Sequence, residues 1–374
     1  MKLLAVIGTR PEAIKMAPVV REARRRGCSI EVCAAAQHRE LLDQALRPFG
    51  VEPEYDLDLM RPGQSLADLT ARAIEGIDGL LARVAPQWVL VQGDTTTTLA
   101  ASLAAFYQGR KVAHIEAGLR TRDLAQPFPE ELNRIVVDGV AAAHFVPTST
   151  ARESLLREGL PAETLHLTGN TVIDALRWIR KHPSRPLSAR PAALQGERRV
   201  VATIHRRESF GPVLESIGRA LRRIADRHED VRLILPLHPN PNVRPVLEAL
   251  LGGHPRISLV EPMDYPEFVE MMAGASLILS DSGGVQEEAP SLGVPALFLR
   301  ATTERPEAIE AGAVRLVPPD EDGIVAAAEG VLGDPCEHAR MARAVNPYGD
   351  GRAAERIVSI LRGESWEPFE EGGR

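Results

Sequence analysis

Three acidic residues stand where predicted strands end or a predicted helix begins, and acids in such places can do proton chemistry. Asp94 follows the apolar run WVLVQG, Glu116 lies near the end of the apolar run KVAHIEAG, and Glu130 begins a segment of helical periodicity. Carboxyl groups that share a site push each other's pKa values apart, so that one donates a proton while another accepts it. The sequence therefore indicates a candidate acid–base cluster, with a simple helix cap at Asp94 and unrelated acids elsewhere as the open alternative.

The stretch DSGGVQEEAPSLG, residues 281–293, follows the apolar run SLILS and combines two adjacent glycines with two adjacent glutamates. Ser282, Gly283 and Gly284 offer a hydroxyl group and backbone N–H groups to a phosphate at a helix N-terminus. A carboxylate about one helical turn further along lies far enough from that phosphate to accept hydrogen bonds from a ribose diol. A phosphate with sugar hydroxyls is typical of a nucleotide, and acids that only complement the helix dipole are the equal alternative.

Basic and imidazole side chains lie at other predicted strand ends. Arg10 and Lys15 belong to GTRPEAIKMAP, at a predicted helix start where the macrodipole disfavours cations. Their placement indicates an anionic ligand, or else a capped turn with two solvated cations. His205 ends the run VVATIH, with Arg206 directly after it, and His238 ends the run VRLILPLH. One strand-end histidine is usually structural, whereas several at equivalent edges favour a binding role.

Alternating strands and helices have to position these residues. Near-continuous apolar runs, separated by segments of helical periodicity, predict an α/β fold of two Rossmann-like, doubly wound domains whose parallel sheets are covered on both faces. Ligands of such sheets bind beyond the carboxyl ends of the strands, where the residues above lie. The predicted strands are 2–8, 30–36, 88–93, 111–118, 143–148, 164–169, 200–205, 231–238, 257–262, 276–284 and 294–300.

The domain organisation follows from length and from one proline-rich segment. A chain of 374 residues exceeds the size at which a single core usually stops growing. Residues 182–199 lack periodicity, which predicts a linker between a first domain at 1–181 and a second at 200–349, with a cleft between them. A further helical stretch is predicted at 350–362, and the tail at 364–374 is expected to be loosely held.

Composition excludes several classes of protein. The net charge of −7 argues against a nucleic-acid binder or an anionic-membrane binder, because those carry a basic excess. Cys28, Cys33 and Cys336 form neither a disulfide framework nor a metal knuckle. No stretch approaches the roughly 18 uninterrupted apolar residues of a membrane helix. We therefore expect a soluble cytoplasmic protein with no nucleic-acid, membrane or metal partner.

Ten motifs, taken in order, carry a resemblance to a known family. They are GTRPEAIKMAP, AQHRELLDQ, GDTTTT, EAGLRT, PFPEELNR, GNTVIDAL, HRRESFG, SDSGGVQEEAPSLGVP, TTERPEA and NPYGDG. Together they closely resemble the bacterial non-hydrolysing UDP-N-acetylglucosamine 2-epimerases. The resemblance implies the GT-B glycosyltransferase-like fold, with the C-terminal segment 350–374 returning to the first domain and UDP bound mainly by the second. It also implies UDP-GlcNAc, UDP-ManNAc and UDP as ligands, no cofactor, a homodimer, and a role in cell-surface polysaccharide synthesis.

The same resemblance assigns roles to the matching positions. The implied catalytic residues are Asp94, Glu116, Glu130 and His205. The implied UDP-binding residues are Arg10, Lys15, Ser282, Gly283, Gly284, Glu288 and Arg305, and His205 would help Arg10 to neutralise phosphate charge. A second, allosteric UDP-GlcNAc would contact Gln37, Glu40, Gln64, Arg206 and His238.

The chemistry implied by this family needs more than one acid. The C2 hydrogen of the sugar has no neighbouring carbonyl to acidify it, so direct deprotonation would be prohibitive. In the family's route UDP leaves C1, loss of the C2 proton gives 2-acetamidoglucal, the proton returns to the opposite face, and UDP adds back. One acid–base group per face of C2 is then needed, and three acids can supply them. A GT-B glycosyltransferase with a UDP-sugar donor, a hydrolysing epimerase that releases ManNAc and UDP, and a sugar-nucleotide sensor are the alternatives.

Overall fold

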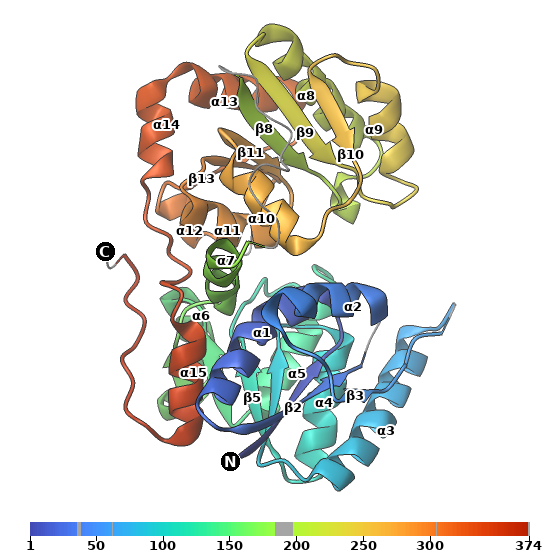
Figure 1. Cartoon of the computed structure of the whole chain (residues 1–374), viewed down its shortest axis with the longest axis vertical. Coiled ribbons are helices and arrows are strands. Elements are labelled where there is room, and N and C mark those ends of the chain that lie inside the picture. The colour runs from blue at the N-terminus through green and yellow to red at the C-terminus, as the bar shows by residue number, and fades with distance from the viewer. Residues whose placement is uncertain (36–38, 62, 184–196, 304, 373–374) are drawn as a thin grey trace. The chain divides into compact units, whose positions relative to one another are not determined.

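The chain divides into two compact units, each built around its own parallel sheet (Figure 1). The computed structural model describes residues 1–35, 39–61, 63–183, 197–303 and 305–372. Unit 1 consists of Met1–Lys181 with Tyr348–Glu371, and unit 2 consists of His182–Pro347 with Gly372–Arg374. Unit 1 is therefore discontinuous in sequence.

The sheet of unit 1 is parallel throughout and has the strand order β3-β2-β1-β4-β5-β6-β7. Its strands are β1 (Lys2–Ile7), β2 (Ser29–Ala34), β3 (Tyr55–Asp56), β4 (Trp88–Gln92), β5 (Lys111–Ile115), β6 (Ala143–Val146) and β7 (Leu165–Leu167). Parallel neighbours need crossover connections, and helices provide them on both faces, as the apolar strand patterns predict.

Two groups of helices contact the sheet of unit 1 (Figure 1). In one group α3 (Leu66–Val84), α4 (Thr96–Tyr107) and α5 (Glu130–Val140) pack in sequence. In the other, α1 (Arg10–Arg25) packs against α2 (Arg39–Leu46), α7 (Thr171–Lys181) and α15 (Ala353–Arg362). Helix α6 (Ser149–Arg157) and the short 3-10 helices η1 (Arg47–Phe49) and η2 (Ala162–Thr164) complete the unit. A large core lies where the sheet meets α3 and α4, with Leu4, Ile77 and Val89 fully buried.

Side chains of the preceding loops start these helices. Thr9 and Glu12 form a capping box at α1, and Ser65 and Asp68 form another at α3. Thr95 Oγ1 accepts the N–H of the third residue of α4. These caps make the strand-to-helix loops short and fixed, which suits a site at the carboxyl edge of the sheet.

Unit 2 repeats this architecture with the strand order β10-β9-β8-β11-β12-β13. Its strands are β8 (Arg198–Thr203), β9 (Val231–Pro236), β10 (Ile257–Val260), β11 (Leu277–Ser280), β12 (Ala296–Leu299) and β13 (Val314–Val317). One helix group contains α8 (Pro212–Arg227), α9 (Arg244–Leu251), α13 (Glu321–Gly333) and α14 (Pro335–Ala342). The other contains α10 (Tyr265–Ala273), α11 (Gly283–Leu292) and α12 (Glu307–Glu310), and η4 (Arg207–Ser209) precedes α8.

In each sheet the strand order reverses beside its first strand, between β1 and β4 in unit 1 and between β8 and β11 in unit 2. Such switch points are where doubly wound sheets usually bind ligands. In unit 1 the two loops are in close contact, because a Cβ on Gly8 would lie 2.1 Å from Thr97 Oγ1. In unit 2 the Asp281 carboxylate accepts the backbone N–H of His205 at 3.1 Å, which joins the two loops. These two switch points are therefore candidate ligand-binding positions of the two units.

The strand prediction from the sequence missed two of the observed strands. It did not predict β3, which has only two residues, or β13, whose run VRLV is interrupted by Arg315. Several predicted strands also extend beyond the observed ones, since the apolar runs continue into the loops. Glu116 and His205, expected at strand ends, lie just past β5 and β8.

The predicted linker at 182–199 falls largely on residues that the structure does not describe, 184–196. Arg198 and Arg199, its last two residues, already belong to β8. Within the described ranges, no helix combines the length and the apolar character required to cross a membrane.

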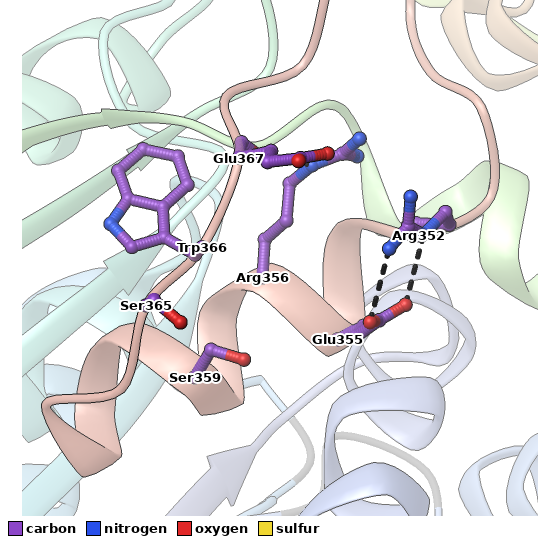
Figure 2. A pocket seen from close by; sticks show the side chains of 7 residues that line it. All are labelled: Arg352, Glu355, Arg356, Ser359, Ser365, Trp366 and Glu367. Atoms are coloured by element: carbon purple, nitrogen blue, oxygen red, sulfur yellow. Dashed lines mark hydrogen bonds and ion pairs between the residues drawn. The ribbon is translucent and has the colours of Figure 1, made fainter.

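The tail is packed against unit 1, so the prediction that it is loosely held is wrong. Phe369 is buried and its N–H donates to the Leu167 carbonyl at 2.9 Å. Glu371 Oε2 accepts from Ser149 Oγ at 2.6 Å. The two aromatic residues of the tail are scattered among acids, which hid their packing from a periodicity argument. A cavity of about 320 Å³ lies between the tail and α15, lined by Arg352, Glu355, Arg356, Ser359, Ser365, Trp366 and Glu367 (Figure 2).

Helix α15 is fixed to unit 1 by a carboxylate of α7. Asp174 accepts the N–H groups of Ala353 and Ala354 at 3.2 and 2.9 Å, which caps the first turn of α15. Burial raises the pKa of Asp174 to about 7. When folding raises the pKa of a carboxyl group, the folded protein becomes less stable as the pH rises from the unfolded-state pKa to the folded-state pKa. The free energy of unfolding should therefore fall as the pH rises toward about 7, because ionisation of Asp174 is disfavoured in the folded protein.

Candidate active site

Glu116 follows β5 directly and is held in a backbone conformation that residues with a Cβ rarely adopt. Its φ is 66°, in the left-handed region. The side chain is buried, and both carboxylate oxygens accept from Lys15 Nζ at 2.7 Å. Gln92 Nε2 also donates to Glu116 Oε2. The lysine offsets the cost of burying this carboxylate, and the half-buried Arg10 lies at the start of the same helix.

Asp94, in the turn after β4, is not a helix cap, because Thr95 fills that position. Its Oδ2 accepts from Arg134 Nε at 2.9 Å and lies 2.7 Å from Arg134 Nη2. Its backbone carbonyl accepts from Asn133 Nδ2 at 2.8 Å. The side chain is partly exposed, so a polar ligand can still reach it while α5 holds it in place.

Glu130 and Glu131 share the first turn of α5 but have different surroundings. Glu131 is fully buried and accepts from the N–H groups of Thr121 and Arg122 at 3.0 and 2.8 Å. Glu130 Oε2 is also buried, yet it has no hydrogen-bond partner within the described residues. An unsatisfied buried carboxyl oxygen is costly, so Glu130 fits a role toward a ligand. Glu131 instead fixes the loop that follows Glu116.

These contacts place the three predicted acids in one connected region of unit 1. Gln92 links Glu116 to the end of β4, where Asp94 follows two residues later. Arg134 binds Asp94 and, through Nη1 at 2.9 Å, Glu131, which is the neighbour of Glu130. The carboxyl edges of β4 and β5 and the first turn of α5 therefore converge, as acid–base chemistry requires.

Glu12 is a positioning residue that the sequence reasoning missed. It is almost fully buried, and its Oε1 accepts from Thr95 Oγ1 at 2.6 Å and Thr98 Oγ1 at 2.9 Å. Its Oε2 accepts the N–H of Gly8 at 2.9 Å and that of Thr9 at 2.5 Å. Burial raises the pKa of Glu12, although the threonine hydroxyls lower it in part. The capping-box spacing T-x-x-E could have identified it, and the threonine run serves this carboxylate.

In unit 2, Asp281 organises the loop after β8. It is fully buried, and its Oδ2 accepts from the N–H groups of His205 and Arg206 at 3.1 and 3.0 Å and from Ser209 Oγ at 2.9 Å. His205 Nδ1 lies 3.4 Å from Asp281 Oδ1. The sequence reasoning quoted Asp281 without giving it a role, because its partners lie more than seventy residues away.

The first turn of α11 is built to hold an anion. Ser282 is its N-cap residue but makes no side-chain capping hydrogen bond. A Cβ on Gly283 would lie 2.8 Å from Arg305 Nη1 and 3.4 Å from Arg206 Nη2, so two guanidinium groups approach this turn. A Cβ on Gly284 would have Ser282 Oγ as its nearest atom, at 3.9 Å. Open backbone donors, the helix dipole and two arginines together suit a phosphate.

Arg305 explains part of the polar sequence Gln286–Glu287 in the second turn of α11. Arg305 Nε donates to Glu287 Oε1 at 2.7 Å, and its carbonyl accepts from Gln286 Nε2 at 2.6 Å. Thr303 Oγ1 donates to Gln286 Oε1 at 2.9 Å. Gln286 and Glu287 thus orient an arginine and do not complement the dipole alone. Arg305, which the sequence contributed only through the family motif, is a buried member of the group.

Glu288 and His205 are each oriented by a neighbour. Glu288 is buried, and its Oε1 accepts from Tyr265 OH at 2.6 Å. The His205 ring stacks on His238, with centroids 5.7 Å apart and planes inclined by 23°. Partial burial lowers the pKa of His205, and the charges of Arg206 and His238 act in the same direction against Asp281.

The predicted allosteric residues do not form one group within a unit. Gln37 lies outside the described residues. Glu40 is exposed on α2, and Gln64 Oε1 accepts the N–H of Arg61 at 3.0 Å, both in unit 1. Arg206 and His238 belong to unit 2, beside His205. The allosteric site therefore stays a prediction. The cavity beside α15 (Figure 2) is lined by none of the predicted site residues.

A family model described as UDP-N-acetylglucosamine 2-epimerase matches residues 21–362. The chain belongs to the UDP-N-acetylglucosamine 2-epimerase family. The resemblance inferred from the motifs is thereby confirmed. The match spans most of both units and begins after β1 and the predicted residues Arg10 and Lys15.

Members of the UDP-N-acetylglucosamine 2-epimerase family are similar to this chain in sequence and in structure. The UDP-N-acetylglucosamine 2-epimerase of Escherichia coli strain K12 is 50% identical over 370 residues, which cover 97% of this chain and 98% of the relative. The UDP-GlcNAc 2-epimerase of Neisseria meningitidis, solved bound to UDP-GlcNAc, has a TM-score of 0.93 and 44% identity, with 97% of this chain and 100% of that chain covered. The S. aureus MnaA–UDP co-structure has a TM-score of 0.90 and 40% identity, with 100% of both chains covered. These likenesses confirm the predicted fold class of two doubly wound, parallel-sheet domains.

Proposed function

We propose that the protein interconverts UDP-GlcNAc and UDP-ManNAc without hydrolysis. A relative with 50% sequence identity is named UDP-N-acetylglucosamine 2-epimerase. A structurally similar epimerase has been solved with UDP-GlcNAc bound. The observation that carries the proposal is the connected group of Asp94, Glu116 and Glu130 at the edge of one sheet. Neither a nucleotide sensor nor a simple transferase needs three acids in that place.

Unit 1 handles the proton in this proposal. Once UDP leaves C1, the ring has oxocarbenium character and the C2 proton becomes removable. One carboxylate takes that proton, which leaves 2-acetamidoglucal and UDP, and another returns a proton to the opposite face of C2. UDP then re-forms its bond to C1. Glu116 is held by Lys15 and Asp94 by Arg134, so each acid keeps a fixed direction during both halves of the reaction.

Unit 2 binds the diphosphate and the ribose in this proposal. The first turn of α11, with Arg305 and Arg206 beside it, stabilises the diphosphate as leaving group and as nucleophile. His205 adds a donor at the adjacent loop, and Glu288 accepts hydrogen bonds from the ribose hydroxyls. The positive groups carry the phosphate charge, so the route calls for no cofactor.

The first prediction concerns exchange at C2. With UDP-GlcNAc as the only substrate in heavy water, NMR should show UDP-ManNAc with deuterium at C2 and almost no free sugar. The proton returned to C2 comes from a carboxyl group that has equilibrated with solvent, which is the reason for the label. A glycosyltransferase would show no exchange without an acceptor, and a hydrolysing epimerase would release ManNAc and UDP. Either result would overturn the proposal.

We further propose that two copies of the chain associate through the α4–α5 surface of unit 1. This surface exposes large apolar side chains, namely Phe106, Tyr107, Leu124, Phe128, Leu132 and Ile135. Phe106 and Tyr107 are 56% and 69% exposed, and monomers seldom leave such groups uncovered together.

Light scattering tests this association. The wild type should have twice the mass of the chain, and the double substitution Phe106→Ser with Tyr107→Ser should shift it toward the monomer. Leu41→Ser, on α2, is the matched control, since Leu41 is also exposed but lies outside the α4–α5 surface. A wild type that is monomeric at high concentration would contradict the proposal.

We place the reaction in the cytoplasm, where the three free cysteines would stay reduced. By likeness to its family, the product would supply ManNAc units for cell-surface polysaccharide. Sugar analysis of the cell-surface polysaccharide of a strain that lacks this protein tests the assignment, because that polysaccharide should then lack ManNAc.

A further inference from the structure

A buried histidine–aspartate pair lies behind the three acids of unit 1. His114 of β5 and Asp138 of α5 are both almost fully inaccessible to solvent. His114 Nδ1 lies 2.6 Å from Asp138 Oδ1, and His114 Nε2 lies 2.8 Å from the carbonyl oxygen of Gly93. Neither residue can touch a substrate from this position, so any role in the reaction acts through other groups.

The partners of His114 define its protonation state. The Gly93 carbonyl can only accept a hydrogen bond. The Arg120 guanidinium, whose positive charge is permanent, lies 2.8 Å from Asp138 Oδ2 and favours the ionised form of that carboxyl group. Asp138 is therefore a carboxylate, which also only accepts. Both ring nitrogens of His114 must donate, and a ring that donates at both is an imidazolium.

The Asp138 carboxylate also holds the loop that follows Glu116. Its Oδ2 accepts from Arg120 Nη2 at 2.8 Å and from the N–H of Gly118 at 3.4 Å. Arg120 also contacts Glu158, the C-cap residue of α6, with Arg120 Nε 2.8 Å from Glu158 Oε1. The Asp138 side chain thus contacts both the strand that precedes Glu116 and the loop that follows it.

The pair is also connected to the chain segments that carry Asp94 and Glu130. His114 fixes the carbonyl of Gly93, the residue directly before Asp94. Asp138 belongs to α5, the helix that Glu130 begins. The chain segments that carry Asp94, Glu116 and Glu130 therefore all meet at this pair.

We propose that His114 and Asp138 form a charged positioning pair that fixes the three acids relative to one another for the transfer of the C2 proton. This inference rests on the proposed epimerase function. Proton transfer needs heavy atoms within hydrogen-bond reach of C2 on both faces. A displacement of about 1 Å in such a site costs on the order of 100-fold in rate. The pair carries a positive and a negative group in contact, which makes its complete burial tolerable.

The charge state of the pair can be measured in the wild-type protein. Selective ¹⁵N labelling of histidine should show one ring with two protonated nitrogens at neutral pH, assigned by its absence from the His114→Gln spectrum. The charged or titratable groups around the pair are Asp138, Arg120, Glu158 and His144. His144 Nε2 lies 2.9 Å from the Asp138 carbonyl oxygen, and burial lowers the pKa of His144, so it stays neutral. A neutral His114 ring at neutral pH would overturn the proposal without any variant.

Kinetics test the positioning role. Asp138→Asn keeps the shape but removes the charge, so kcat for UDP-ManNAc formation should fall about 100-fold while KM and the Kd for UDP change less than about threefold. Asp174→Asn is the matched control, because Asp174 is a partly buried carboxyl of unit 1 that caps α15, and the kcat of this variant should stay at the wild-type value.

The outcomes separate this inference from the proposed function. A wild type that forms no UDP-ManNAc defeats the epimerase proposal, and the histidine spectrum still decides the charge of the pair. An active wild type whose Asp138→Asn variant keeps kcat within about threefold defeats the positioning role. A fall in kcat that is matched by Asp174→Asn would show a general loss of stability and would equally overturn it.

Discussion

Replacement of Glu116 by glutamine should abolish exchange at C2, with a loss of at least about 1000-fold in rate, while UDP still binds. Glutamine keeps the shape of the side chain but cannot accept the C2 proton, and it gives Lys15 an amide group in place of one carboxylate oxygen. UDP affinity, measured by calorimetry, should stay near the wild-type value, because the proposed UDP contacts lie mainly in unit 2. Asp94→Asn should behave in the same way.

The Lys2–Glu31 pair provides the control for this experiment. Glu31 of β2 lies 3.7 Å from Lys2 Nζ, so Glu31→Gln removes a lysine–carboxylate pair from the same sheet but far along the strands from the site. Its exchange rate should be unchanged. Loss of UDP binding in both Glu116→Gln and Asp94→Asn would mean that these acids bind the nucleotide and do not transfer the proton.

Gly283→Ala should weaken UDP binding by about 10- to 100-fold, the loss expected from one charge-assisted hydrogen bond. The new Cβ would lie 2.8 Å from Arg305 Nη1, and Arg305 cannot move freely because Glu287 and Gln286 hold it. The guanidinium group must therefore leave the first turn of α11. Calorimetry with UDP measures the loss, and thermal unfolding without ligand should show a small destabilisation.

Gly284→Ala separates this cause from contact with the ligand itself. Its Cβ has no atom nearer than 3.9 Å in the ligand-free protein, and alanine favours a helix over glycine by up to about 1 kcal/mol. The melting temperature without ligand should therefore stay level or rise. Any loss of UDP affinity in this variant must come from a phosphate that approaches the backbone. If Gly283→Ala binds UDP normally, the first turn of α11 is not the phosphate site.

The sequence predicted the main strands and the places where the chemistry gathers, because both depend on local pattern. Apolar runs marked the strands, and a parallel sheet puts all their carboxyl ends at one edge. Asp94, Glu116 and Glu130 were found at that edge for this reason. The pattern was weak for β3 and β13, which are short or interrupted by polar residues.

The partners of these residues could not be predicted, since they come from distant parts of the chain. Lys15 and Glu116 are 101 positions apart, and Ser209 and Asp281 are 72 apart. The assignment of Lys15 to UDP binding stays a prediction, and its contact with the Glu116 carboxylate was not predicted. No local pattern distinguishes Glu131, which holds a loop, from Glu130, which has an unsatisfied oxygen. Side-chain pairing is thus the information that only the folded chain supplies.

The return of residues 348–371 to unit 1 has a consequence for biosynthesis. Helix α15 packs on α1 and α7, and Phe369 covers the edge strand β7, yet all of these late residues leave the ribosome after unit 2. Until they arrive, the nascent first unit presents the surfaces of α1 and α7 to the cell uncovered, so chaperones have a defined window in which to bind it. A single cut of the polypeptide also cannot separate two intact units, since the sequence of unit 1 is interrupted by that of unit 2.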